Sequence, residues 1–153
     1  MIVAALSCPP SEDPVAAAVR SVAGRVAHGL TGRPPEVVLD PLCGSAGALR
    51  QADLLVVAAA VPLDATCSSL LDVLEEGVLA GCVVFLAAVG SWPAEAGTVD
   101  RALSPAVRRA GGLCMAPTLH VVDATPAPID AYCRYWRPIT RTLLQGRTSR
   151  RAA

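Results

Sequence analysis

The chain has 153 residues, of which 53% are hydrophobic, 17% are charged and only 3% are aromatic. Thirteen basic residues, all of them Arg, balance thirteen acidic ones. This length and composition predict one globular domain with a core of Ala, Val and Leu, and they argue against a nucleic-acid-binding protein. No apolar run reaches the ~18 residues of a membrane span, and the first residues lack a secretory signal pattern. We therefore expect a cytoplasmic protein with no membrane partner.

Strands and helices are expected to alternate along the chain. Short apolar runs bounded by Gly, Pro or Ser predict buried strands, and apolar residues three and four apart predict helices. Asp13 before Pro14 is a favourable start for the first helix. Pro138 is expected to interrupt the last helix, because its ring blocks the preceding turn. The expected elements are strand Ile2–Leu6, helix Pro14–Leu30, strand Glu36–Leu39, helix Ser45–Gln51, strand Ala52–Val61, helix Ala65–Leu79, strand Gly81–Gly90, helix Thr98–Ala110, strand Gly112–Val122 and helix Pro126–Leu144.

Five apolar strands, each followed by a helix, predict a parallel sheet covered on both faces. The expected fold is an α/β three-layer sandwich with right-handed crossovers. The domain is expected to span residues 1–146, followed by a basic, disordered tail over residues 147–153. Ligands of such sheets bind beyond the carboxyl ends of the strands, where the strand order reverses. The loops Ser7–Asp13, Ala60–Thr66 and Val89–Ala96 should meet at that edge.

Six cysteines and two histidines show no spacing typical of a metal site, so no metal is predicted. Cys8 and Cys67 fall in the first loop and at a helix start, and the sequence does not define a role for either. His120 ends a strand near the carboxyl edge. It is a candidate acid–base group, although a lone His is more commonly structural.

The loop "LSCPPSEDPV", Leu6 to Val15, lies between the first strand and the first helix, where a phosphate would be held by backbone N–H groups and the helix dipole. The hydroxyls of Ser7 and Ser11 are suitable ligands. However, two adjacent prolines each remove a donor, and Glu12 and Asp13 add two anions to the first turn. Two interpretations stay open: a phosphate site on Ser7 and Ser11, or a plain capped helix.

Four stretches of the chain resemble the flavodoxin-like NADPH-dependent FMN reductase family. The most specific are "VDRALSPAVRRAGGLCMAPTLHV" and "LAGCVVFLAAVGS". "LSCPPSEDP" takes the place of the family's phosphate loop, and "ADLLVVAAAVPLDATCSSLL" that of the segment flanking the flavin. The likeness is greatest to the short reductases that partner luciferase-like flavin monooxygenases. It covers residues 1 to about 123.

The resemblance implies a five-stranded parallel sheet in the order 2-1-3-4-5, with FMN at its carboxyl edge and NADPH above the flavin. The protein would pass a hydride from NAD(P)H to FMN and supply reduced flavin to a monooxygenase, in a biosynthetic pathway and as a dimer. Trp92 is the best candidate for stacking on the flavin, because no other aromatic lies in the edge loops. The implied cofactor-binding residues are Ser7, Ser11, Ala60, Val61, Pro62, Asp64, Gly90, Ser91 and Trp92.

All three edge loops depart from the family pattern at once, and this motivates an alternative function. The family's Thr-Pro-Val-Tyr segment is Ala-Ala-Val-Pro here, over residues 59–62, so the aromatic that would flank the flavin is missing. The alternative is a non-catalytic homologue that acts as a structural or regulatory subunit of a flavoenzyme complex, in a heterodimer with a related reductase. A third hypothesis is a flavin-independent reaction with His120 or Asp64 as proton carrier.

Overall fold

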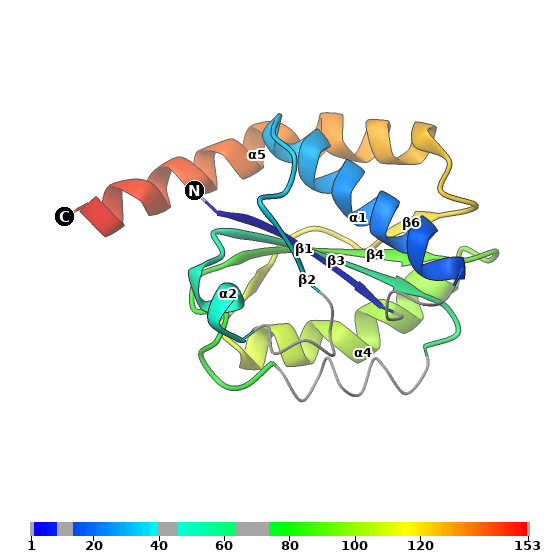
Figure 1. Ribbon diagram of the computed structural model, residues 1–153, viewed down its shortest axis with the longest axis horizontal. Helices are drawn as coiled ribbons and strands as arrows, with labels where there is room; N and C mark the ends of the chain where they lie inside the picture. Colours follow the sequence, from blue (N-terminus) through cyan, green and yellow to red (C-terminus); the bar gives the residue numbers. More distant parts are fainter. Residues whose placement is uncertain (1, 9–13, 40–45, 64–73, 153) are drawn as a thin grey trace.

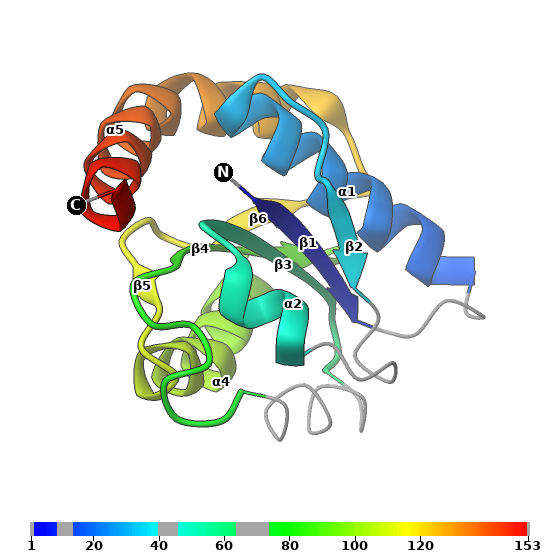
Figure 2. The same cartoon turned by 60° about the vertical axis from the view of Figure 1, so that its left-hand side comes forward.

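The computed structural model describes residues 2–8, 14–39, 46–63 and 74–152 of the chain (Figure 1). A sheet lies between two helical layers. Helices α1 (Pro14–Thr31) and α5 (Pro126–Ala152) cover one face, and α2 (Ala46–Gln51) and α4 (Glu95–Arg109) cover the other. Figure 2 shows α1 and α5 running side by side over the sheet. The predicted three-layer sandwich is confirmed.

The sheet is parallel throughout, and its strands follow the order β2-β1-β3-β4-β5. The predicted order is therefore confirmed, with one difference at the edge. The expected strand Gly112–Val122 is two short strands, and both pair with β4, one near each of its ends. Pro117 lies in the break, where a residue without an N–H cannot donate to the ladder. The strands are β1 (Val3–Cys8), β2 (Val37–Leu39), β3 (Leu54–Ala60), β4 (Val83–Val89), β5 (Leu113–Cys114) and β6 (Leu119–Val121).

The continuous apolar runs of the central strands are explained by burial on both faces. Along β3, Leu54, Val56 and Ala58 pack toward α1 and α5. The intervening residues Leu55, Val57 and Ala59 pack toward α2 and α4. Successive side chains of a strand point to opposite faces, so a strand covered on both sides needs apolar residues at every position.

Helix α5 docks on the sheet through aromatic side chains. Tyr132 and Trp136 each pack edge-on against Phe85 of β4, with ring centroids 6.2 and 6.5 Å apart. The Tyr132 hydroxyl donates to the carbonyl of Pro117 at 2.8 Å. Tyr135 contacts Trp136 but is 70% exposed. Tyr132 and Trp136 therefore fix α5 on the sheet.

Two helix predictions were wrong. Glu76–Gly81 forms turns, so the predicted helix Ala65–Leu79 does not reach its expected end; residues 65–73 lie outside the described ones. Helix α5 is unbroken at Pro138. Pro138 is exposed, so water can reach the carbonyl that loses its hydrogen bond. Nearby hydroxyls also bond within the helix, including Thr142 Oγ1 to the Pro138 carbonyl at 3.2 Å.

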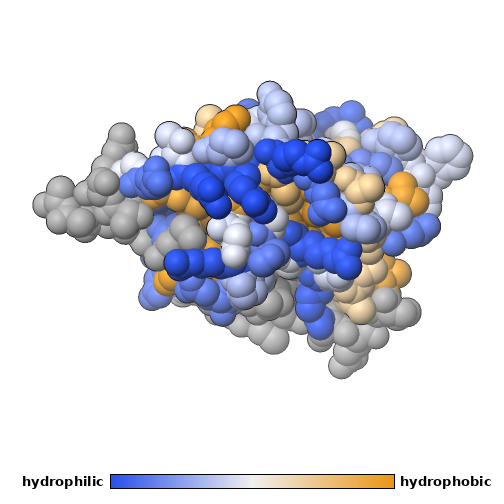
Figure 3. Space-filling model, turned by 90° about the horizontal axis from the view of Figure 1, so that it is seen from above, coloured by the Kyte–Doolittle hydropathy of each residue, from blue (hydrophilic) through white to orange (hydrophobic). Residues whose placement is uncertain are grey.

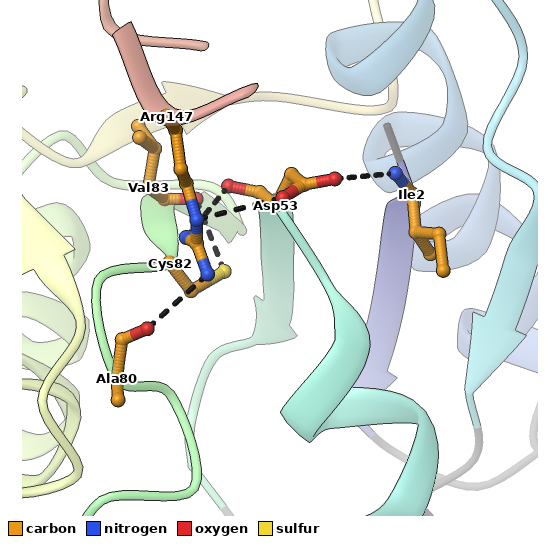
Figure 4. A network of polar contacts seen from close by, with 6 residues as sticks. All are labelled: Ile2, Asp53, Ala80, Cys82, Val83 and Arg147. Atoms are coloured by element: carbon orange, nitrogen blue, oxygen red, sulfur yellow. Dashed lines mark hydrogen bonds and ion pairs between the residues drawn. The ribbon is translucent and has the colours of Figure 1, made fainter. Parts of the chain in front are cut away.

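The prediction of a disordered tail is also wrong for its first residue, Arg147. Helix α5 continues through Arg147, and its guanidinium reaches the buried end of β3 (Figure 4). Nε lies 3.4 Å from Oδ1 of Asp53, and Nη2 donates to the Ala80 carbonyl at 3.2 Å. The other Asp53 oxygen accepts the Ile2 backbone N–H at 2.8 Å. Asp53 thus links the start of β1 to the end of α5, at the amino edge of the sheet.

None of the helices in the described part of the chain combines the length and the apolar character needed to cross a membrane.

Candidate functional site

The carboxyl ends of the central strands lie side by side in register. Cys8 pairs with Ala59, Ala60 with Val89, and Val89 with Val121. The ladder extends one residue further, because Val61 N–H donates to the Val89 carbonyl at 3.1 Å and Gly90 N–H to the Val121 carbonyl at 3.0 Å. The loops after β3, β4 and β6 therefore leave the sheet together. The strand order reverses between β1 and β3, and this edge is where ligands of such sheets bind.

The segment after β3 offers an apolar surface. Ala60 and Val61 are half-buried and Pro62 is exposed. Val61 packs against the core on the α4 side, whereas Ala60 packs against the core beneath α1 and α5. These three predicted residues are brought together beside the β4 loop. They carry no ionisable side chain, so their contribution to a ligand site is shape and backbone polar groups.

The loop after β4 places Trp92 in solvent. Gly90 is half-buried, Ser91 is exposed, and the Trp92 side chain is 72% exposed. An indole left this exposed is a large apolar surface with no core to cover it, and such groups commonly serve recognition. Of the predicted site residues described here, Trp92 has the most surface free for a ligand.

Glu95 is a site residue that the sequence interpretation missed. It is the first residue of α4, and its Oε2 accepts the Trp92 N–H at 3.0 Å, while its own N–H donates to the Trp92 carbonyl at 3.0 Å. Its carboxylate lies over Gly90 so closely that a Cβ there would collide with it. The sequence signal for this contact is a Glu three residues after Trp92, where the turn starts; a capping box has the same spacing. It was overlooked because α4 was predicted to begin only at Thr98.

His120 lies beside this carboxylate. It sits in β6 next to Ala88, and its Nε2 is 3.8 Å from Oε2 of Glu95. That distance is too long for a hydrogen bond. Nε2 is buried and has no hydrogen-bond partner among the described residues. The prediction that His120 lies near the carboxyl edge is confirmed, and its neighbour there is Glu95.

Several predicted residues cannot be placed. Ser11, Asp64 and Cys67 lie outside the described residues.

Ser7 and Cys8 were expected to open the first loop, but both belong to β1, which ends at Cys8. The expected strand ended at Leu6, where the apolar run stops. The pairing with β3 continues for two more residues, because ladder hydrogen bonds do not depend on side-chain polarity.

The described cysteines near the core are poor nucleophiles. Burial raises the pKa of the Cys133 thiol from 9.0 to about 11. Burial also raises the pKa of Cys114, although the hydrogen bond with Ser104 opposes it. A thiol must ionise to act as a nucleophile, so both are protonated near neutral pH. The acid–base side chains at the described part of the edge are Glu95, His120 and Asp123, an exposed acid in the loop after β6.

Solved structures of flavin proteins superpose on nearly the whole chain. Oxidised flavodoxin 2 from Bacillus cereus has a TM-score of 0.67 and 14% identity, covering 95% of this chain and 99% of the flavodoxin. The apo form of the NADH:FMN oxidoreductase EMOB has a TM-score of 0.68 and 19% identity, covering 94% and 88%. RosB with its bound intermediate 8-demethyl-8-formylriboflavin-5'-phosphate has a TM-score of 0.71 and 12% identity, covering 97% and 81%.

These likenesses establish a flavodoxin-like fold. No protein-family model matches the chain, and neither does any curated protein.

Proposed function

We propose that the carboxyl edge binds FMN and that the protein is an NAD(P)H-dependent FMN reductase, which supplies reduced flavin to a monooxygenase. The observation that carries the proposal is the exposure of Trp92. This residue is 72% exposed and lies beside Gly90, at the edge where the strand order reverses. The superposed flavodoxin, FMN oxidoreductase and RosB structures are consistent with a flavin at this position.

The residues fit a flavin ring better than its phosphate. Ala60, Val61 and Pro62 provide an apolar edge on the β3 side, and Trp92 provides an aromatic surface on the β4 side. A bound flavin would supply the hydride chemistry, so the protein needs only to orient it and exclude water. The scarcity of acid–base groups at the described part of the edge is compatible with that role.

The test is an FMN titration followed by the visible absorption and fluorescence of the flavin. Loss of one aromatic stack costs ~1–3 kcal/mol, so Trp92→Ala should weaken FMN binding by about 5- to 150-fold. Tyr135→Ala is the matched control, because Tyr135 is 70% exposed but lies on α5, away from the edge. Binding by neither wild type nor variant at ~100 μM FMN would reject the proposal, since enzymes work with KM values of ~1 μM–1 mM.

A second candidate, a non-catalytic subunit of a flavoenzyme complex, is favoured by Glu95. Its carboxylate fills the space over Gly90, where a ring would need close approach to the backbone. If this carboxylate closes the site, wild type should bind no FMN, and Glu95→Ala should gain binding. FMN binding by wild type with NADPH oxidation on addition of FMN would support the reductase instead.

A further inference from the structure

The basic residues of this neutral chain are concentrated in one helical layer. Helix α1 carries Arg20 and Arg25 and no acid. Helix α5, up to Gly146, carries Arg134, Arg137 and Arg141 against the single acid Asp130. The layer therefore has five Arg and one Asp, a net charge of +4, while the whole chain has a net charge of zero. The compensating acids lie elsewhere in the chain.

Within the described part of the chain, these guanidiniums form no ion pairs. Ion pairs of the described residues involve Arg50, His120 and Arg147. None of the five Arg of the layer has an acidic group within 4.0 Å among the described residues. Arg137 has an internal role, because its Nε donates to the Gly29 carbonyl near the end of α1 at 2.6 Å. The other four are exposed.

A groove of about 550 Å³ runs between the two helices. Arg25 and Arg137 line it from opposite sides, and Asp130 lies on the α5 side. Gly24 keeps it open, since nothing lies within 4 Å of the position a Cβ would take there. Pro34 adds apolar surface. Figure 3, which looks down on this layer, shows hydrophilic residues along the face with apolar surface between them.

Helix α5 also exposes two apolar side chains on its flank away from the groove. Tyr135 is 70% exposed and Ile139, one turn later, is 40% exposed. Tyr and Arg are the side chains most enriched where protein partners bind, and energetically dominant contacts cluster around them. Charge and apolar surface together distinguish this face from an ordinary solvated helix layer.

We propose that the α1–α5 face docks an acidic and partly apolar segment of a partner protein. The face comprises the groove, with Arg25 and Arg137 at its sides, and the exposed Arg134 and Arg141 of α5. The proposal does not depend on flavin binding. A nucleic acid fits less well, because Asp130 lines the groove and the sequence pI is about 6.7. A second copy fits less well too: it would have to offer a different, acidic surface, and such contacts generate open chains unless the rotation closes.

The probe is a labelled synthetic peptide of about twelve residues, mostly Glu with two central Leu, which as a helix spans ~18 Å. A matched peptide has Lys in place of Glu. Fluorescence anisotropy should show that the acidic peptide binds with a Kd below ~1 mM and that the basic peptide does not. Raising the salt from ~0.05 to ~0.5 M should weaken binding, because exposed charges are screened.

Two triple variants separate this face from charge in general. Arg25→Ala/Arg134→Ala/Arg141→Ala spares Arg137, which holds α1, and should weaken binding about tenfold or more, equal to ~1.4 kcal/mol. The control removes the same charge from exposed positions on α4, the helix on the opposite face of the sheet, and should leave binding within about twofold. Its substitutions are Arg101→Ala, Arg108→Ala and Arg109→Ala.

The proposal is overturned by no binding of the acidic peptide at ~1 mM, or by an equal loss in both triple variants. Tighter binding of a short DNA duplex than of the acidic peptide would reassign the face to nucleic acid. Concentration-dependent self-association that the first triple variant abolishes would reassign it to a second copy. Circular dichroism confirms that both variants are folded, because Arg and Ala have similar helix propensities.

Discussion

Replacement of Arg147 by Ala should measurably destabilise the fold, although sequence composition assigns this residue to a solvated tail. The Arg147 and Asp53 side chains are only 15% and 11% exposed. Breaking a buried pair by removing one partner costs ~3–5 kcal/mol. The contacts here are long, at 3.2–3.4 Å, and Asp53 keeps the Ile2 N–H after the change. We therefore expect a loss of ~2 kcal/mol in the free energy of unfolding, below the full cost of a broken pair.

Urea denaturation followed by circular dichroism gives the free energy directly. In a chain of this size ~2 kcal/mol also lowers Tm by ~4–8 °C. Arg141→Ala is the control, because Arg141 is exposed on the same helix, and surface substitutions stay within about ±0.5 kcal/mol. Asp53→Ala should cost more than Arg147→Ala, ~3–5 kcal/mol, since it leaves both Ile2 N–H and a buried guanidinium without their carboxylate.

Truncation after Gly146 tests the same contact by removing the end of α5 that carries Arg147. It should destabilise the fold at least as much as Arg147→Ala, because it removes Arg147 together with the end of α5. Equal stabilities of Arg147→Ala and Arg141→Ala would refute the reasoning and support a domain that ends at residue 146. A double-mutant cycle of Asp53→Asn and Arg147→Ala should give a coupling energy of ~0.5–3 kcal/mol.

The remaining predictions concern glycines and a buried thiol. Gly24→Ala should raise the free energy of unfolding by ~0.5–1 kcal/mol, because the added Cβ meets nothing within 4 Å in a helix interior. Gly29→Ala on the same helix should lower the free energy of unfolding, because its Cβ would lie 2.5 Å from Cys133 Sγ. Thermal melting compares the two variants. Gly90→Ala should cost ~0.5–1.5 kcal/mol by the same assay, since Glu95 must move and its hydrogen bond from Trp92 N–H is lost. The pKa of Cys133 is raised to about 11 in the folded chain, so the unfolded chain loses this proton first and stability should fall as pH rises from ~9 to 11. Urea titrations of wild type and Cys133→Ala give the free energy of unfolding across this range, and the two values should converge or cross if the thiol is responsible.

The sequence predicted the layers well because the signals for them are local. The apolar runs of β3 and β4 are continuous, whereas a strand with one solvated face alternates apolar and polar residues. The apolar spacing of α1 repeats over several helical turns. The split of the last strand was not predicted, although Pro117 marks it, because composition alone does not show which side of an edge strand must donate hydrogen bonds. Arg147 was missed for the opposite reason: its partner Asp53 is 94 residues away in the chain.

The candidate site was predicted in outline but not in its polar detail. The ends of β3 and β4 place Ala60 opposite Val89, the residue directly before Gly90, as the parallel register requires. Glu95 was missed because its role depends on a turn that begins before the regular helix. Helix boundaries are commonly uncertain by a residue or two, and here that uncertainty concealed the acid closest to the β4 loop.

The position of Glu95 changes how Gly90 bears on function. A glycine in this loop is expected where a flavin ring approaches the backbone. In this chain, however, the missing side chain makes room for the Glu95 carboxylate, which holds the turn through Trp92 N–H. Gly90 therefore has a structural explanation whether or not a ligand binds, and it is not evidence for a cofactor. The residue that favours a flavin at this edge is then Trp92, whose exposed indole has no such structural explanation.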